Sequence, residues 1–174
     1  MCALAADIRA KGNLILCTAS TGIAALLLPG GLTAHSTFKI PFGDKLVEGA
    51  FCNVKAETER AEVLRRASLI IWDEIPMANK LAPEALDLAL RDLRICNRPF
   101  GGATILMSGD WRQVGPVVPF GTADDVVDAA LISSYLWKHV NRFRLTQSMR
   151  DRLDEPNSKA VRAIGEGRIS TITL

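Results

Sequence analysis

Residues 68–74 have the sequence Ser68-Leu69-Ile70-Ile71-Trp72-Asp73-Glu74, in which an apolar run ends in two acidic side chains. A continuous apolar run of this length is typical of a strand that is buried on both faces of a parallel sheet. After a helical segment, a second apolar run leads into Ser108-Gly109-Asp110-Trp111-Arg112-Gln113. Because ligands bind at the carboxyl ends of parallel strands, we expect the polar residues after both runs to share one site.

The rest of the chain alternates apolar strand patterns with helical patterns, which predicts an α/β fold: a parallel sheet with helices on both faces. We expect 32–42 to be extended and rich in turns, and 43–56 to be irregular. We expect helices over 2–11, 23–28 (capped by Ser20), 57–66, 83–95, 124–132, 135–139 (amphipathic) and from 159 to 164. We expect strands over 13–18, 69–72, 103–108 and 143–145, with the second and third of them central in the sheet.

The composition is that of one soluble globular domain: 174 residues, 48% hydrophobic and 23% charged. A net charge of +2 is compatible with nucleic-acid binding but does not argue for it unaided. The four cysteines are scattered, so neither a disulfide framework nor a zinc site is indicated, and a reducing, intracellular compartment fits best. No apolar run is long enough to span a bilayer, so we expect no membrane partner.

The residues after the two central strands suggest nucleotide chemistry. Asp73 could bind a phosphate-associated Mg²⁺ and Glu74 could polarise an attacking water, while Gln113 could hydrogen-bond a γ-phosphate. The alternative is that these are solvated loop side chains. Trp111 could stack on a base, although packing against the protein is the favoured role for a single tryptophan. Arg150, in Leu145-Thr146-Gln147-Ser148-Met149-Arg150, could neutralise charge on a transferred phosphoryl group or be a solvated surface charge.

Two hydroxyl-rich segments suggest contacts to a phosphate backbone. Thr18-Ala19-Ser20-Thr21-Gly22 joins a strand to a helix, and Thr33-Ala34-His35-Ser36-Thr37-Phe38-Lys39 offers hydroxyls, a histidine, an aromatic ring and a lysine. Such a mixture suits the binding of a single nucleic-acid strand. The alternative, which residue types alone favour, is that Ser20 caps a helix and His35 is buried and hydrogen-bonded.

Together these segments resemble the Pif-type DNA helicases of superfamily 1, and especially the helicase domains of Helitron transposons. The resemblance lies in residues 18–31 (similar to motif Ia), 33–41 (Ib), 69–77 (II), 99–113 (III) and 145–150 (IV). It implies a RecA-like P-loop NTPase fold, ATP with Mg²⁺, and 5′-to-3′ translocation on single-stranded DNA with unwinding at duplex junctions. It also implies roles in DNA repair, recombination and telomere maintenance, and a nuclear or mitochondrial location.

The resemblance assigns roles to individual residues. Asp73 would hold the metal, Glu74 would activate water, Gln113 would couple the γ-phosphate to DNA, and Arg150 would contact the γ-phosphate. The residues implied in contacts with the DNA backbone are Thr18, Ser20, Thr21, His35, Ser36 and Phe38.

One element of the family pattern is missing from the sequence. There is no G-x-x-x-x-G-K-[ST] phosphate loop, and no Gly-Lys dipeptide at all. We therefore expect residues 1–150 to be a first RecA-like domain truncated at its N-terminus, with 151–174 starting the connection to a missing second domain. The alternative is a catalytically inactive, single-stranded-DNA-binding remnant of a transposon helicase. An unrelated P-loop kinase or GTPase would not explain residues 34–36 or Gln113.

Overall fold

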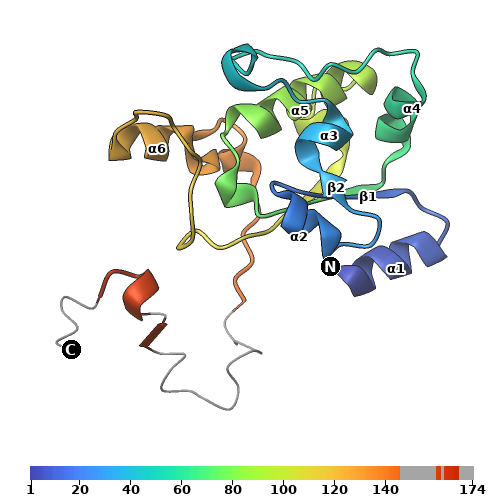
Figure 1. Cartoon of the computed structure of the whole chain (residues 1–174). Helices are drawn as coiled ribbons and strands as arrows, with labels where there is room; N and C mark the ends of the chain where they lie inside the picture. The colour runs from blue at the N-terminus through green and yellow to red at the C-terminus, as the bar shows by residue number, and fades with distance from the viewer. Residues whose placement is uncertain (146–159, 162, 169–174) are drawn as a thin grey trace.

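A four-stranded parallel sheet with the strand order β2-β1-β3-β4 is the centre of the fold (Figure 1). The computed structural model describes residues 1–145, 160–161 and 163–168. Its strands are β1 (Ile15–Ala19), β2 (Leu32–Thr33), β3 (Leu69–Asp73) and β4 (Thr104–Met107). In the parallel register Ala19 lies beside Asp73, and Trp72 beside Met107. The carboxyl ends of β1, β3 and β4 therefore meet at one edge, as the sequence predicts.

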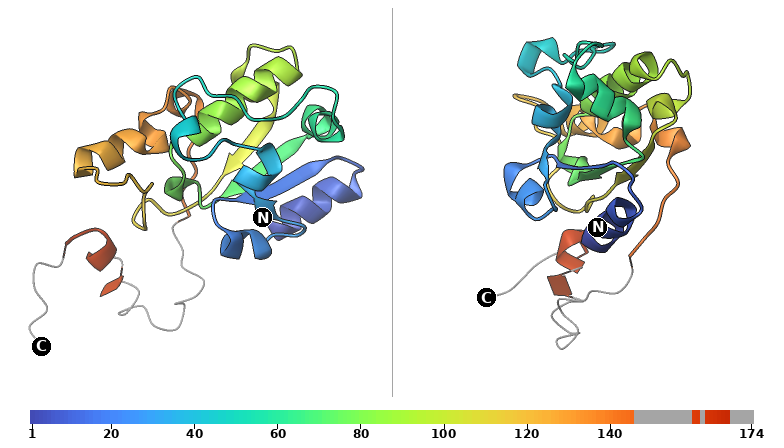
Figure 2. Two further views of the ribbon diagram at one scale, coloured as in Figure 1. Left: turned by 45° about the horizontal axis from the view of Figure 1, so that its top comes forward. Right: turned by 90° about the vertical axis from the view of Figure 1, so that its right-hand side faces the viewer.

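Helices cover both faces of this sheet, because alternate side chains of β3 enter two separate cores. Leu69 and Ile71 pack with residues of α1 (Cys2–Ala10) and α2 (Gly22–Leu26). Ile70 and Trp72 pack on the opposite face with residues of α4 (Glu59–Arg66) and α5 (Leu81–Leu93). The left view of Figure 2 shows the sheet between α1 and α5. The predicted α/β fold with helices on both faces is confirmed.

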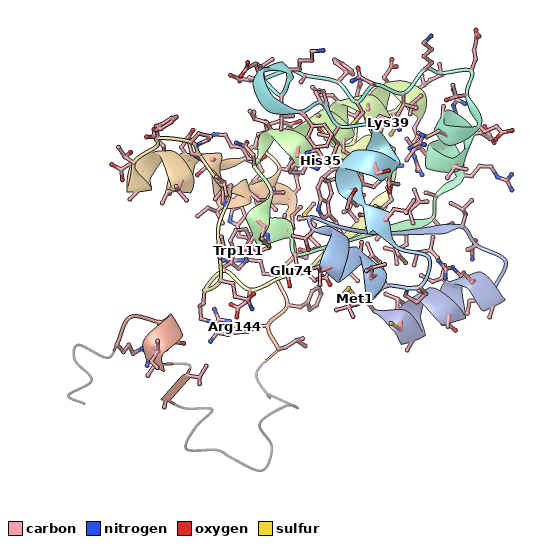
Figure 3. All side chains as sticks on the ribbon, viewed as in Figure 1. Met1, His35, Lys39, Glu74, Trp111 and Arg144 are labelled. Carbon is pink, nitrogen blue, oxygen red and sulfur yellow. The ribbon has the colours of Figure 1, made fainter. Side chains whose placement is uncertain are left out.

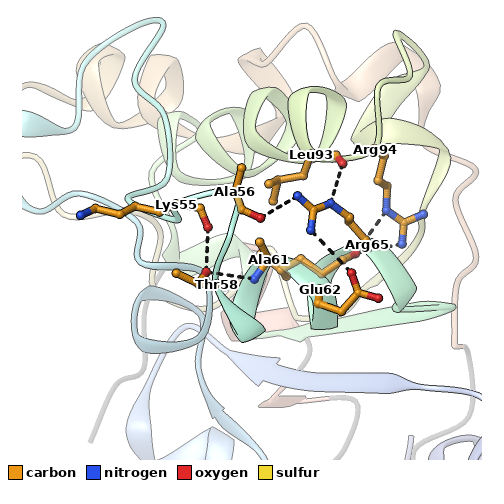
Figure 4. Close-up of polar contacts among 9 residues, drawn as sticks. Lys55, Ala56, Thr58, Ala61, Glu62, Arg65, Leu93 and Arg94 are labelled. Carbon is orange, nitrogen blue, oxygen red and sulfur yellow. Dashed lines mark hydrogen bonds and ion pairs between the residues drawn. The ribbon is translucent and has the colours of Figure 1, made fainter.

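Two arginines fasten α4 to the end of α5 (Figure 4). Arg65 donates from Nε to the Leu93 carbonyl at 3.1 Å and from Nη2 to the Ala56 carbonyl at 2.7 Å. Arg94 donates in return to the carbonyl oxygen of Leu64. The last carbonyls of each helix lack intrahelical partners, so these guanidinium groups satisfy them while joining the two helices.

A buried carboxylate on α5 anchors two later segments. Asp87 is fully buried and accepts hydrogen bonds from the backbone N–H of Phe100 and, at 2.7 Å, from the hydroxyl of Tyr135. Arg91 Nε lies 2.8 Å from the same carboxylate. A buried charge is tolerated only when it is paired and hydrogen-bonded, and Asp87 meets both conditions.

The segment from Leu32 to Phe42 differs from its predicted extended form. It contains β2 and then α3 (Ala34–Phe38), because the Thr33 side chain accepts a hydrogen bond from the Ser36 N–H and caps this short helix. The following 43–56 is irregular apart from the 3-10 turn η1 (Gly43–Lys45), as predicted.

Other predicted elements need correction. Thr21, not Ser20, caps α2, since its side chain accepts from Ala24 N. Within the described residues β4 is an edge strand, not a central one. Residues 143–145 form no strand, and Phe143 and Leu145 are almost fully exposed. The remaining short elements are η2 (Ile75–Met77), η3 (Pro99–Gly102), α6 (Ala123–Ala129), η4 (Leu131–Ser133) and η5 (Trp137–His139), the last two replacing predicted α-helical turns.

Within the part of the chain that the structure describes, no helix is both long and apolar enough to cross a membrane.

Candidate functional site

The two acid-tipped strands meet through one hydrogen bond. Asp73, the last residue of β3, accepts at Oδ1 from the Ser108 hydroxyl at 2.7 Å and from the Glu74 N–H at 3.0 Å. Ser108 directly follows β4 and also lies 3.4 Å from the sulfur of Met1 through its hydroxyl oxygen. The ends of β3 and β4 and the start of α1 thus come together at a half-buried carboxylate. Ser108 belongs to the polar segment that the sequence places at this edge, but the sequence assigns it no role of its own.

Glu74 is held in a left-handed conformation, with φ 54° and ψ 38°, next to Asp73. Its loop packs tightly on the end of β4: Ile75 N donates to the Ser108 carbonyl at 3.0 Å. Gly109 has a φ of +154°, and a Cβ at this position would stand 2.3 Å from Pro76 Cδ. Glycine is therefore required at 109 for the two loops to approach, and their contact fixes the backbone that carries Glu74. Figure 3 shows Glu74 at this edge of the fold.

The residues present fit a magnesium ion bound with nucleotide phosphate. One Asp73 oxygen is occupied by its two donors, and the half-exposed carboxylate has a second oxygen for a cation. Among the described residues no group of three or more His, Cys, Asp and Glu side chains could hold a metal. Mg²⁺ is commonly bound by one or two carboxylates, with water and phosphate oxygens as the other ligands.

The segment after β4 contains an ion pair and two exposed side chains that the sequence singles out. Arg112 contacts Asp110 with Nε at 3.0 Å and Nη2 at 3.1 Å, and this hydrogen bonding lowers the pKa of Asp110 below its usual range. Gln113 N donates to the Asp110 carbonyl at 3.1 Å, while the Gln113 side chain is exposed. Trp111 is 46% exposed and packs edge-on against Trp137, with ring centroids 5.6 Å apart. Trp111 therefore packs against the protein, as the sequence favoured, but at the surface.

Two of the residues expected to contact DNA are inside the protein. Thr18 is fully buried, and its hydroxyl donates to the Ile71 carbonyl at 2.7 Å. Phe38 is also fully buried and packs against Trp72, with a centroid separation of 5.7 Å. Neither side chain is accessible to a nucleic-acid backbone in this structure, so both positions support the fold.

The other expected contact residues reach the surface. Ser20 and Thr21 are half-buried between β1 and α2, His35 is half-buried on α3, and Ser36 is exposed. His35 stacks on Phe42, with centroids 4.4 Å apart, and burial lowers the pKa of its imidazole. Arg150 lies outside the described residues, so its predicted place in the site stays a prediction.

Trp72 connects the two groups of residues. Its indole Nε1 donates to Ser20 Oγ at 3.0 Å, and Ser20 N donates to the Asp73 carbonyl at 3.0 Å. Two hydrogen bonds thus join Ser20, a residue expected at the DNA, directly to β3, the strand that ends in Asp73. A tryptophan before the acidic pair gave no sequence signal for this contact, because it depends on the pairing of β1 with β3.

Comparison with known proteins identifies the family to which this chain is similar. The model of the family described as PIF1-like helicase matches residues 1–172. The chain is similar to the ATP-dependent DNA helicase PIF1 of Candida albicans, with 34% identity over 134 residues, 74% of this chain and 15% of that protein. It is also similar to the ATP-dependent DNA helicase Pif1 of Psychrobacter, with 33% identity over 110 residues, 63% of this chain and 16% of that protein.

Solved structures agree with the sequence relatives. The crystal structure of Bacteroides Pif1 bound to single-stranded DNA matches 94% of this chain and 39% of that chain, with a TM-score of 0.78 and 27% identity. The fold is therefore RecA-like, as the sequence resemblance predicts. The chain spans only a minor part of the length of these relatives, but the match extends over nearly all of its own residues. The chain belongs to the PIF1-like helicase family.

Proposed function

We propose that this chain forms a RecA-like motor domain of an ATP-dependent DNA helicase, which moves 5′-to-3′ along single-stranded DNA and unwinds duplex junctions. The observation that carries the proposal is the continuity of β3. Its last residue, Asp73, accepts a hydrogen bond from Ser108. The preceding Trp72 donates a hydrogen bond to Ser20, a residue that the family resemblance implies in DNA contact. A single rigid strand can thus relate the positions of nucleotide and DNA.

On the nucleotide side, Asp73 would hold Mg²⁺ together with ATP. The bound ion would neutralise charge on the phosphates. Glu74, fixed by the contact between Gly109 and Pro76, would accept a proton from the attacking water. Gln113, whose side chain is exposed, would hydrogen-bond the γ-phosphate, with Arg150 as a further phosphate contact.

On the DNA side, Ser20, Thr21, His35 and Ser36 would contact the phosphate backbone. Hydroxyl and imidazole contacts to phosphate position a strand without selecting its sequence, as suits a motor that moves along DNA. We propose that a second RecA-like domain works with this one, since stepping requires closure on nucleotide. Family membership supports a role in DNA repair, recombination and telomere maintenance, in the nucleus or the mitochondrion.

A second candidate function is single-stranded-DNA binding without hydrolysis. The surface positions of Ser20, Thr21, His35 and Ser36 support it, because contacts from these side chains to a phosphate backbone need no hydrolysis.

The two candidates are separated by measuring ATPase activity with and without single-stranded DNA. The polypeptides would be the 174-residue chain and a longer one that adds a phosphate loop before it. For the helicase function, the longer polypeptide shows DNA-stimulated hydrolysis that Glu74→Gln lowers by about 10²- to 10⁴-fold. Glu57→Gln, at an exposed position before α4, serves as the matched control and leaves the rate unchanged. DNA binding without hydrolysis in every variant would favour the second candidate instead.

A further inference from the structure

Lys39, directly after α3, has a backbone conformation that lysine rarely adopts. Its φ and ψ are 56° and 41°, in the left-handed region, and its side chain is exposed. Left-handed backbone is unfavourable for residues with a Cβ, and such outliers cluster at functional sites. Glycine would hold this position without strain. A left-handed residue commonly ends a helix, but glycine usually holds that position, so the exposed ammonium of Lys39 is available for a role besides ending α3.

Contacts from two other segments hold Lys39 in place. Arg60, on α4, donates from Nη1 to the carbonyl oxygens of Ser36 at 2.6 Å and Thr37 at 2.7 Å, which completes the end of α3. The backbone N–H of Asn53 donates to the Lys39 carbonyl at 2.9 Å. These contacts involve only backbone atoms of 36–39, so they fix the chain direction and leave the Lys39 ammonium free to contact a ligand.

The residues that surround Lys39 in sequence indicate which class of ligand it could bind. Ser36 and His35 lie on α3 only three and four residues before Lys39, so the exposed Lys39 directly follows the short helix that carries both of them. Figure 3 labels His35 on α3 and Lys39 at the end of this helix. Among the described residues no ion pair involves Lys39. The surface thus combines an exposed hydroxyl, a largely neutral imidazole and an uncompensated cation.

We propose that Lys39 is a further phosphate-contacting residue of the single-stranded-DNA site, on a backbone that Arg60 and Asn53 hold at the end of α3. The inference rests on the proposed function. In it, Ser36 and His35 supply neutral hydrogen bonds and Lys39 supplies the charge, so Lys39 accounts for salt dependence at this part of the strand. Arg60 is a positioning residue, because it acts through the carbonyls of α3.

The test uses Lys39→Gly in the full 174-residue chain. Glycine relieves the left-handed backbone, so the variant should melt roughly 2–4 °C above the unaltered chain. It should nevertheless bind a fluorescent oligothymidylate about threefold to tenfold more weakly at low salt. The slope of log K against log salt concentration should become shallower by about 0.7, the loss of one phosphate contact. A purely structural role for Lys39 cannot raise stability and weaken binding together.

Two further variants complete the design. Lys39→Arg keeps the charge and should keep the salt slope. Lys11→Ala removes the same charge at the end of α1, where Lys11 pairs with Asp7 at 2.6 Å, and should leave the slope unchanged. If Lys39→Gly binds with the unaltered slope, the inference is wrong while the proposed function stands. If the unaltered chain binds no oligothymidylate at any salt concentration, the DNA site and the role of Lys39 are both overturned.

Discussion

Ser108 donates a hydrogen bond of 2.7 Å to Asp73 Oδ1 and thereby joins the ends of two adjacent parallel strands. Ser108→Ala should lower the free energy of unfolding by about 1 kcal/mol, because a half-buried carboxylate loses a donor. Urea unfolding measures this loss. Ser68→Ala, at the opposite end of β3, where the hydroxyl is exposed and 3.5 Å from Asn13, should change stability by less than about 0.5 kcal/mol. Equal effects at 68 and 108 would contradict the importance of the bond.

Gly109→Ala should be more costly, since the new Cβ would lie 2.3 Å from the ring of Pro76. We expect a loss of about 1–3 kcal/mol together with displacement of the loop that carries Glu74. Gly115→Ala is the matched control, because its Cβ would stand at an ordinary 3.5 Å from Val126. Urea unfolding of both variants measures the difference, and comparable stability would show that the two loops do not pack as described.

Asp87→Ala should destabilise the protein by about 3 kcal/mol, because Arg91, Tyr135 and the Phe100 N–H lose a shared buried partner. Asp92→Ala, an exposed position on the same helix, should have an effect below about 0.5 kcal/mol. Chemical unfolding of the two variants would distinguish a buried anchor from a general effect of removing acidic residues from α5.

Tyr135 should make the protein sensitive to alkaline pH. Burial, and then the hydrogen bond to Asp87, raise the pKa of its phenol above the ordinary value. In the unfolded chain the phenol ionises near pH 10, so this stabilisation is complete below about pH 10 and decreases as the pH rises toward the folded pKa. The difference in unfolding free energy between the unaltered chain and Tyr135→Phe should therefore become smaller above about pH 10. Tyr135 is the only tyrosine, so phenolate absorbance reports its ionisation directly, and a normal titration of the folded protein would refute the prediction.

The long elements of the fold could be predicted from the sequence because their patterns are local. The apolar run at 69–72 is buried on both faces and the amphipathic α5 on one, and in each the buried residues follow from the local pattern. α3 could not be predicted, because its five residues depend on capping by Thr33 and on Arg60, a residue from another helix. The prediction of a strand at 143–145 is wrong because a strand also depends on a partner, and these residues have no neighbouring strand in the described part of the chain.

In the candidate site, too, some features could be predicted from the sequence and others could not. Asp73 and Ser108 come together because parallel strands end at one edge, which the strand pattern predicts. The burial of Thr18 and Phe38 could not be predicted, because a threonine or an aromatic residue near a strand end suits either a core or a ligand. Only the pairing of β1 with β3 and the packing of Phe38 on Trp72 decide between these roles.

The strand order also has a consequence for how the chain acquires its structure during synthesis. β3 lies between β1 and β4, but the ribosome makes it only after α2, β2, α3 and α4 have emerged. Until then one edge of β1 is unpaired, and the apolar side chains that will form the two cores are exposed. Interruption of translation between Arg66 and Leu69 would leave a nascent polypeptide prone to aggregate. Synthesis of β3 pairs this edge of β1, and the other edge of β3 is paired only when β4 (Thr104–Met107) follows.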